Sequence, residues 1–198
     1  MKLSMFLARI TIVIALVAIA VPASAGPIVV DTWYEFSFGG LGTTANGCAP
    51  DDPAGDFCVG SSGTPTINAD APAWTFTAGA GGATFTVTDA FDSGDRFQIL
   101  DFGAPIGVTS AAGPGSNCGD DPVPCLADGS MSHGAFAFAA GNHSITIAVA
   151  QAGFGAAYFL LQGEIGQETP VPEPATLGLV GMGLAAAIRR RVRRQVTR

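Results

Sequence analysis

The chain has 198 residues, 48% of them hydrophobic and 13% charged, with a formal net charge of −7 at pH 7. All sixteen acidic residues lie between Gly26 and Pro174, where Arg96 is the only Lys or Arg, so this stretch carries a formal charge of −15. Such a charge repels phosphate backbones and anionic lipid, which excludes nucleic acid as a partner and favours divalent cations.

Residues 1–25 have the layout of a secretory signal peptide. Lys2 and Arg9 give a basic start, an apolar run follows at 10–21, and Ala23-Ser24-Ala25 fits a small-residue cleavage site. The apolar run is shorter than the ~20 residues of a membrane span, which favours cleavage over the alternative of a retained N-terminal anchor. We therefore predict cleavage after Ala25, with Gly26 as the mature N-terminus and the rest of the chain exported.

The body, residues 26–168, is of single-domain size, and its many Gly and Pro residues argue against long helices. Residues 83–88 alternate strictly between apolar and Thr side chains, which indicates a strand with one face on a core and the other in water. About eight short strands are predicted, separated by turns rich in Gly, Asp and Asn, at 32–38, 74–77, 83–88, 96–101, 106–109, 135–139, 144–150 and 156–162. This pattern predicts an all-β body, a β-sandwich of the jelly-roll-like kind.

Two loops, residues 46–58 and 117–125, each contain two Cys residues and an Asp-Asp-Pro. An even number of Cys in an exported chain implies disulfides. We favour the local pairs Cys48–Cys58 and Cys118–Cys125, because neither needs long-range chain closure; bonds that join the two loops are the alternative. A zinc site is a weaker interpretation, since there is no C-x-x-C and an oxidising compartment favours disulfides.

Three acidic residues, Asp89, Asp92 and Asp95, fall within seven positions around a Ser-Gly turn, and Asp101 follows the next strand. Calcium takes about six to eight oxygen ligands, so carboxylates gathered at a turn could hold it, although the spacing is not that of an EF-hand. The alternative is a solvated turn whose Asp side chains accept backbone N–H bonds. Calcium is the one cofactor that the sequence suggests.

The C-terminal stretch has three parts, Pro172-Glu173-Pro174, an apolar or Gly run at 175–188, and an Arg-rich tail at 189–198. As a helix the run would be about 21 Å long against a hydrocarbon core of about 30 Å, a marginal transmembrane stop-transfer segment. The arginines would stay cytoplasmic and the body would lie outside. The alternative is an amphipathic helix docked on the body, but the run has no polar face.

These parts, in this order and paired with a signal peptide, resemble the PEP-CTERM sorting signal of Gram-negative bacteria. The resemblance covers residues 171–194, within a linker and sorting segment at 169–198, and the apolar run is shorter than is usual in that family. It implies an exosortase-type protease that processes the tail near Pro172-Glu173-Pro174. It also implies transient residence in the inner membrane through the C-terminal helix, and a cell-surface or extracellular location in biofilm-forming bacteria that produce exopolysaccharide.

Catalytic signatures are sparse in the body. No G-x-S-x-G is present, and His133 and His143 border strands without an H-x-x-H or H-E-x-x-H arrangement, so we expect turn or strand-edge roles for them. We therefore expect a non-enzymatic surface or matrix-associated protein with exopolysaccharide as a candidate partner. The alternative, a secreted glycan-acting hydrolase, would need a deep cleft with two facing carboxylates. A carbohydrate platform would instead need exposed aromatic side chains; the candidates are Trp33, Tyr34, Trp74 and Tyr158, and we expect core packing for each in preference to the platform.

Overall fold

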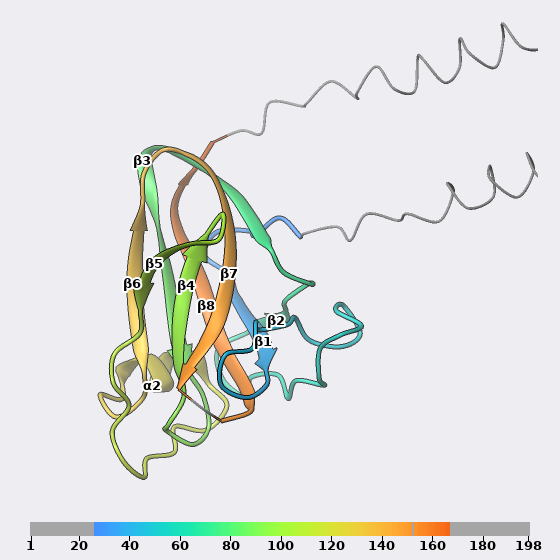
Figure 1. Ribbon diagram of the computed structural model, residues 1–198, viewed down its shortest axis with the longest axis vertical. Coiled ribbons are helices and arrows are strands. Elements are labelled where there is room, and N and C mark those ends of the chain that lie inside the picture. Colours follow the sequence, from blue (N-terminus) through green and yellow to red (C-terminus); the bar gives the residue numbers. More distant parts are fainter. Residues whose placement is uncertain (1–25, 152, 167–198) are drawn as a thin grey trace, which may run out of the picture. The chain divides into compact units, whose positions relative to one another are not determined.

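The computed structural model describes residues 26–151 and 153–166 (Figure 1). The predicted signal peptide with Ala23 and Ala25, and the sorting segment with Pro172, Glu173 and Pro174, lie outside these ranges. In the described ranges no helix is both long and apolar enough to cross a membrane. The elements are β1 (Trp33–Phe38), β2 (Thr66–Asn68), β3 (Trp74–Asp89), β4 (Arg96–Asp101), β5 (Ala104–Val108), α2 (Pro122–Ala127), β6 (His133–Phe138), β7 (Gly141–Gln151) and β8 (Gly155–Ile165).

The all-β class is confirmed, but the two strands predicted at 74–77 and 83–88 are one strand, β3. Its register against β8 shifts between Ala78 and Ala83, and Gly82 has a φ of 75°. A side chain is disfavoured at this φ, and a Cβ at Gly82 would also press on the carbonyl of Phe138. The glycines therefore carry the strand through an irregularity instead of ending it.

Two short elements, β2 and α2, were not predicted from the sequence. β2 has three residues and pairs in parallel with β1. α2 is a single short helix in the second Cys loop, where Asp121 caps its start by accepting a hydrogen bond from the N–H of Val123 (3.1 Å). Pro122 suits the first turn, because its missing N–H would have no partner there.

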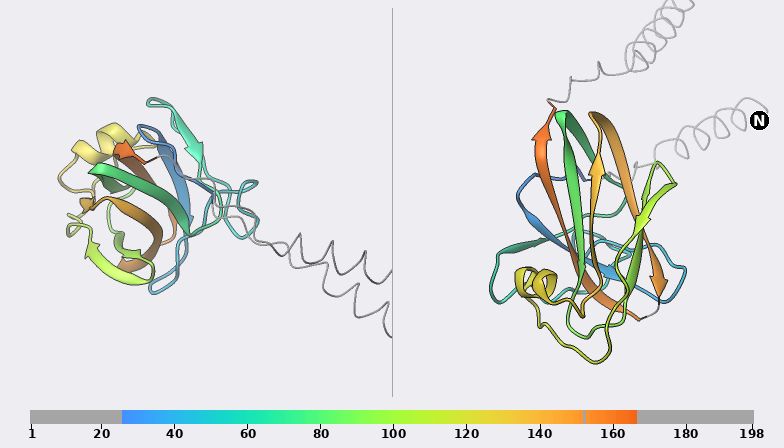
Figure 2. Two further views of the ribbon diagram at one scale, coloured as in Figure 1. Left: turned by 90° about the horizontal axis from the view of Figure 1, so that it is seen from above. Right: turned by 90° about the vertical axis from the view of Figure 1, so that its left-hand side faces the viewer.

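The strands form one hydrogen-bonded sheet, in the order β2-β1-β8-β3-β7-β4-β5, with β6 paired to β3. The sandwich was predicted as facing sheets, whereas here one sheet curls over on itself (Figure 2). The long β3 makes this possible, because its first part pairs with β7 and its second part with both β6 and β8.

The loop after β1 brings two distant strands of the sheet together. Asn46 exchanges backbone hydrogen bonds with Ser37 of β1, and Ala45 donates to the carbonyl of Ile147 in β7 (2.8 Å). Val149 of β7 in turn donates to Thr43 (2.9 Å). Residues 43–46 therefore bridge β1 and β7 and close the curled sheet around its core.

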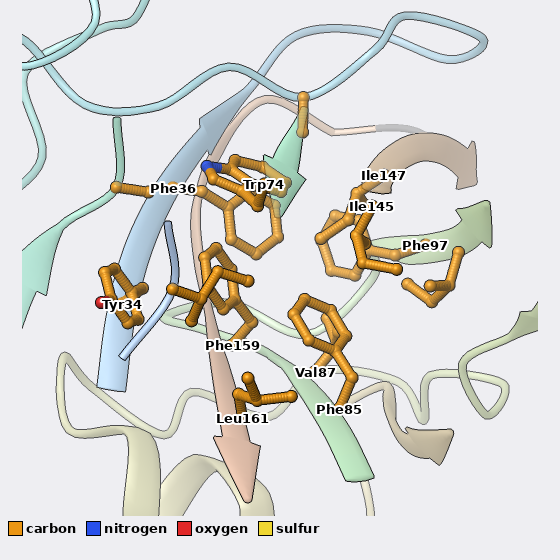
Figure 3. Packing of buried hydrophobic residues seen from close by; sticks show 14 of the residues in the cluster. Tyr34, Phe36, Trp74, Phe85, Val87, Phe97, Ile145, Ile147, Phe159 and Leu161 are labelled. Atoms are coloured by element: carbon orange, nitrogen blue, oxygen red, sulfur yellow. The ribbon is translucent and has the colours of Figure 1, made fainter. Parts of the chain in front are cut away.

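Aromatic rings fill this core (Figure 3). Phe36 of β1 meets Phe97 of β4 edge to face, with ring centroids 5.5 Å apart, although the two strands are not neighbours in the sheet. Phe159 of β8 contacts both Trp74 (4.8 Å) and Phe85 (5.0 Å). Such ring pairs contribute about 0.5–1.5 kcal/mol each beyond the burial of their area. The core thus ties together the parts of the sheet that curl toward each other.

Both ends of the described body lie beside the start of β3. The N–H of Thr75 donates to the carbonyl of Gly26 (3.4 Å), and Gly166 donates to the carbonyl of Thr77 (2.8 Å). β8 runs from Gly155 to Ile165, and eleven residues of strand span roughly 35 Å. The loop before β8 is therefore at the opposite end of the body from Gly166, where the sorting segment follows.

Candidate functional site

The four aromatic residues that were candidates for a carbohydrate platform are all buried, as expected of core packing. The polar atoms of three of them serve the fold: the hydroxyl of Tyr34 accepts from Val29 (2.8 Å), and the hydroxyl of Tyr158 donates to the carbonyl of Asp120 (2.6 Å). The indole of Trp74 donates to a neighbouring carbonyl, and Trp33 packs in a smaller cluster. Core packing is thus the fate of all four.

Other aromatic side chains line an open cavity of about 540 Å³. Phe57 is 85% exposed and Phe154 is 88% exposed, while Phe91 is half-buried. We call this site the phenylalanine hollow; its lining residues are Ser37, Asp56, Phe57, Cys58, Val59, Phe91, Phe154, Gly155 and Ala156. Sequence reasoning missed it. The available signal was that Phe57 adjoins Cys58 in a loop, and that Phe154 stands between two glycines and outside any predicted strand.

The first Cys loop holds Phe57 in place. The predicted bond Cys48–Cys58 is present, with the Cα atoms 5.6 Å apart. Asp52 is buried and accepts hydrogen bonds from the N–H groups of Gly47 (2.7 Å) and Ala54 (2.8 Å). A Cβ at Gly47 would collide with the carbonyls of Ala69 and Asp70, just after β2, so the loop packs closely against that segment.

The second Cys loop holds Phe91. The predicted bond Cys118–Cys125 is present, with the Cα atoms 4.9 Å apart. Phe91 has a φ of 57°, which is costly for a bulky residue and persists only where the surroundings impose it. Its N–H donates to Gly119 and its carbonyl accepts from Cys118, each at 2.9 Å. Each wall of the hollow on this side is therefore fixed by a disulfide-closed loop.

The segment that follows the first Cys loop contacts the second Cys loop. The hydroxyl of Ser62 donates to the carboxylate of Asp120 (2.6 Å), and the N–H of Thr64 donates to that of Asp121 (3.1 Å). These hydrogen bonds join the segment after Cys58 to the second Cys loop, while each disulfide stays within its own loop.

Glu35 is a buried carboxylate beneath the segment that follows Cys58. It accepts hydrogen bonds from the N–H groups of Val59 (3.2 Å) and Gly60 (2.9 Å). Burial raises the pKa of Glu35, and these two hydrogen bonds act in the opposite direction. Burial, followed by the nearby Glu35, also raises the pKa of the Tyr158 hydroxyl. Glu35 supports the segment after Cys58, Tyr158 supports the second Cys loop, and neither residue lines the hollow.

The carboxylates predicted as a calcium site do not converge as a group of three. Asp89 is fully buried and accepts from the N–H groups of Ala90 (3.0 Å) and Asp95 (3.2 Å), whereas Asp92 accepts from the amide of Asn117 (2.8 Å). Within residues 26–151 and 153–166, no group of three or more His, Cys, Asp or Glu side chains is arranged to hold a metal. In this arrangement Asp92 is hydrogen-bonded to Asn117 instead of gathered with Asp89 and Asp95, and calcium binding at these residues stays a prediction.

What remains is a pair of carboxylates, Asp89 and Asp95. Burial, followed by the charge of Asp95, raises the pKa of Asp89 to about 7. Burial also raises the pKa of Asp95, one of whose carboxylate oxygens is buried without a hydrogen-bond partner. The only arginine of the described body, Arg96, donates to the carbonyls of Thr109 and Ser110.

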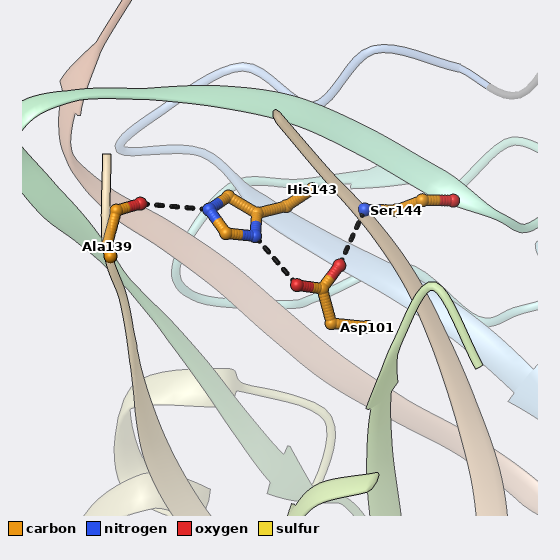
Figure 4. Close-up of polar contacts among 4 residues, drawn as sticks. All are labelled: Asp101, Ala139, His143 and Ser144. Atoms are coloured by element: carbon orange, nitrogen blue, oxygen red, sulfur yellow. Dashed lines mark hydrogen bonds and ion pairs between the residues drawn. The ribbon is translucent and has the colours of Figure 1, made fainter. Parts of the chain in front are cut away.

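A contact between Asp101 and His143 lies at the end of β4 that is opposite to Asp95 (Figure 4). Nδ1 of His143 is 2.8 Å from Asp101, and Nε2 is 2.9 Å from the carbonyl of Ala139. Ser144 approaches Asp101 through its backbone N–H and not through its hydroxyl (2.9 Å). Both ring nitrogens are occupied by acceptor oxygens, so the contact ties β4 to β7 and leaves no ring nitrogen free for a substrate. His133 likewise contacts the carbonyl of Met131 (2.9 Å).

Comparison with known proteins finds a similarity in the C-terminal segment. A family model described as the PEP-CTERM protein-sorting motif matches residues 170–194, which include Pro172, Glu173 and Pro174. No curated protein and no solved structure matches the chain. The motif marks an exported chain that is sorted and processed at the membrane, and it lies outside the residues that form the body.

Proposed function

We propose that this PEP-CTERM protein is a non-enzymatic component of the cell surface or extracellular matrix, and that it associates with exopolysaccharide. The main support for the proposal is the sorting motif at residues 170–194, because such a motif directs the sorting of exported chains. An exosortase-type protease would process the tail near Pro172-Glu173-Pro174. Two disulfides suit the oxidising exterior that this address implies.

The route to the exterior completes the proposal. Residues 1–25 act as a signal peptide that is removed after Ala25, and residues 175–188 reside in the inner membrane until the tail is processed. The strongly acidic surface keeps the body soluble outside the cell. A glycan-acting hydrolase needs two facing carboxylates. Among the residues described, the phenylalanine hollow is lined by one carboxylate, that of Asp56, so we do not advance the hydrolase.

Cell fractionation with peptide mass spectrometry tests the proposal. We expect the body in the matrix and surface fractions with Gly26 at its N-terminus and without residues 189–198. A strain lacking the sorting protease should retain the arginine tail in its membrane fraction, as should a variant with Pro172, Glu173 and Pro174 changed to Ala. Recovery of the intact tail outside the cell would contradict processing, and a body found only inside the cell would contradict export.

A further inference from the structure

We propose that the phenylalanine hollow is a binding site for an uncharged glycan chain. The inference rests on the proposed function, and it adds the site and the charge class of the glycan. The rings of Phe57, Phe91 and Phe154 come from three separate segments of the chain and line one cavity.

The chemistry of the lining fits a sugar ring. Phe57 and Phe154 expose 85% and 88% of their surface, although large apolar side chains are normally buried when the fold permits it. The apolar C–H face of a pyranose can lie on an aromatic ring, while its hydroxyl groups point to the side and donate to acceptors. Asp56 belongs to the same lining, and its carboxylate can accept such hydrogen bonds. The volume of about 540 Å³ is within the range of small-ligand sites.

The hollow is also held ready for a ligand. The Cys48–Cys58 bond closes the loop of Phe57, and Cys118 and Gly119 hold the backbone of Phe91 in its left-handed conformation. A ligand therefore orders little of these two walls when it binds, which lowers the entropic cost of association.

The charge of the lining and of the surrounding body determines which class of glycan can bind in the hollow. The lining contains no Lys, Arg or His, and its one ionisable group is Asp56. The surrounding body has a single arginine against many carboxylates, so it repels anionic glycans such as uronic-acid polymers. The same charge repels a second copy of the body, so a homodimer that buries the phenylalanine rings of the hollow is disfavoured. An uncharged glycan is subject to neither repulsion.

The position of the hollow suits an extended polymer. Gly155 and Ala156, at the start of β8, belong to the lining, whereas Gly166, at the far end of β8, leads to the sorting segment. The two ends are roughly 35 Å apart along the strand. The hollow thus lies away from the end of the body that leads to the membrane-directed tail.

Glycan arrays test the inference on the mature protein purified from outside the cell. The probes are neutral β-glucan, mannan and galactan oligosaccharides, together with anionic alginate and hyaluronan oligosaccharides. We expect binding to a neutral probe, with a Kd that changes little with sodium chloride. Phe57→Ala and Phe154→Ala should each weaken it by roughly fivefold to tenfold, the loss of one ring contact.

Phe102→Ala is the matched control. Phe102 is a 70% exposed phenylalanine in the turn between β4 and β5 and does not line the hollow, so its removal should leave the Kd unchanged. Equal melting temperatures for the variants would separate lost contacts from unfolding. No binding to any neutral probe, binding to anionic probes alone, neutral binding that survives both hollow variants, or a dimer lost in Phe57→Ala would each overturn the inference. A protein that reaches the matrix but fails these tests refutes the hollow and leaves the proposed function standing; a protein absent from the matrix refutes the proposed function.

Discussion

Neutralising Asp89 should remove much of the dependence of folding stability on pH. This carboxyl is fully buried, and its pKa rises from the ordinary 3.8 to about 7 in the folded protein. The unfolded chain therefore loses this proton at lower pH than the folded protein does. The free energy of unfolding should fall as the pH rises from about 4 to about 7, and the contribution of Asp89 should be constant above that.

The size of the effect follows from the shift. A pKa increase of roughly three units corresponds to about 4 kcal/mol of stability lost between the two limits, at about 1.4 kcal/mol per unit. Arg96 does not offset this loss, because its guanidinium is directed to the carbonyls of Thr109 and Ser110. The buried, unpartnered oxygen of Asp95 adds to the cost of ionising the pair.

Urea unfolding at pH 4.5, 6, 7 and 8 measures the effect in wild type and in Asp89→Asn. The variant gives up one of two accepted backbone hydrogen bonds, at a cost of about 1 kcal/mol, and wild type has already lost about as much at pH 4.5, where the unfolded carboxyl is ionised. The two proteins should therefore be about equally stable at pH 4.5, and the variant should be more stable above pH 7. The control is Asp51→Asn, which removes the same charge from an exposed position. General repulsion among carboxylates would change both variants alike. Equal pH profiles for Asp89→Asn and Asp51→Asn would refute the reasoning.

Three further predictions concern the loops. Replacing Cys48 and Cys58 by Ser should cost about 2–3 kcal/mol on the chain-entropy model, and non-reducing peptide mapping should find the Cys48–Cys58 peptide; a cross-loop peptide would contradict the local pairing. Gly47→Ala should cost about 1–3 kcal/mol in thermal or urea unfolding, because its Cβ meets the backbone carbonyls of Ala69 and Asp70, whereas Gly129→Ala, with open space around it, should be nearly neutral. Calcium and sodium chloride at matched ionic strength should raise the melting temperature equally, because Asp92 is bonded to Asn117; a saturable excess with calcium would show that Asp89 and Asp95 recruit further ligands.

Local patterns identified most of the strands. β1 and β4 lie where runs of alternating or β-branched and aromatic residues predict them. The continuity of β3 was not predictable in the same way, since Gly79, Gly81 and Gly82 are typical of a turn, and only pairing with β8 on both sides of them keeps the strand intact. A three-residue strand such as β2 has too few positions to show a period at all.

The candidate site was harder to predict than the fold. Trp33 and Tyr158 drew attention as aromatic residues, but their place in alternating strands put them in the core. Phe57 and Phe154 are exposed because each belongs to a loop outside the strands. That these two loops line the same cavity depends on the tertiary fold, so the sequence pattern does not reveal it. The Cys pairs were predictable because each bond closes within a single loop, which needs no knowledge of the fold.

The pairing of β8 on both edges has a mechanical consequence. β8 lies between β1 and β3, with Gly155 opposite Phe38 at one end and Ile165 opposite Ala78 at the other. A pull between a polymer held in the hollow and the chain beyond Gly166 would run along this strand, and its hydrogen bonds to both neighbours would be loaded together in shear. A pull between Gly26 and Gly166, which both lie beside the start of β3, would instead load the bonds at that end one after another. Forced unfolding depends on the rate of crossing the unfolding barrier, so single-molecule pulling between residues 155 and 166 should require a higher rupture force than pulling between the two ends of the body.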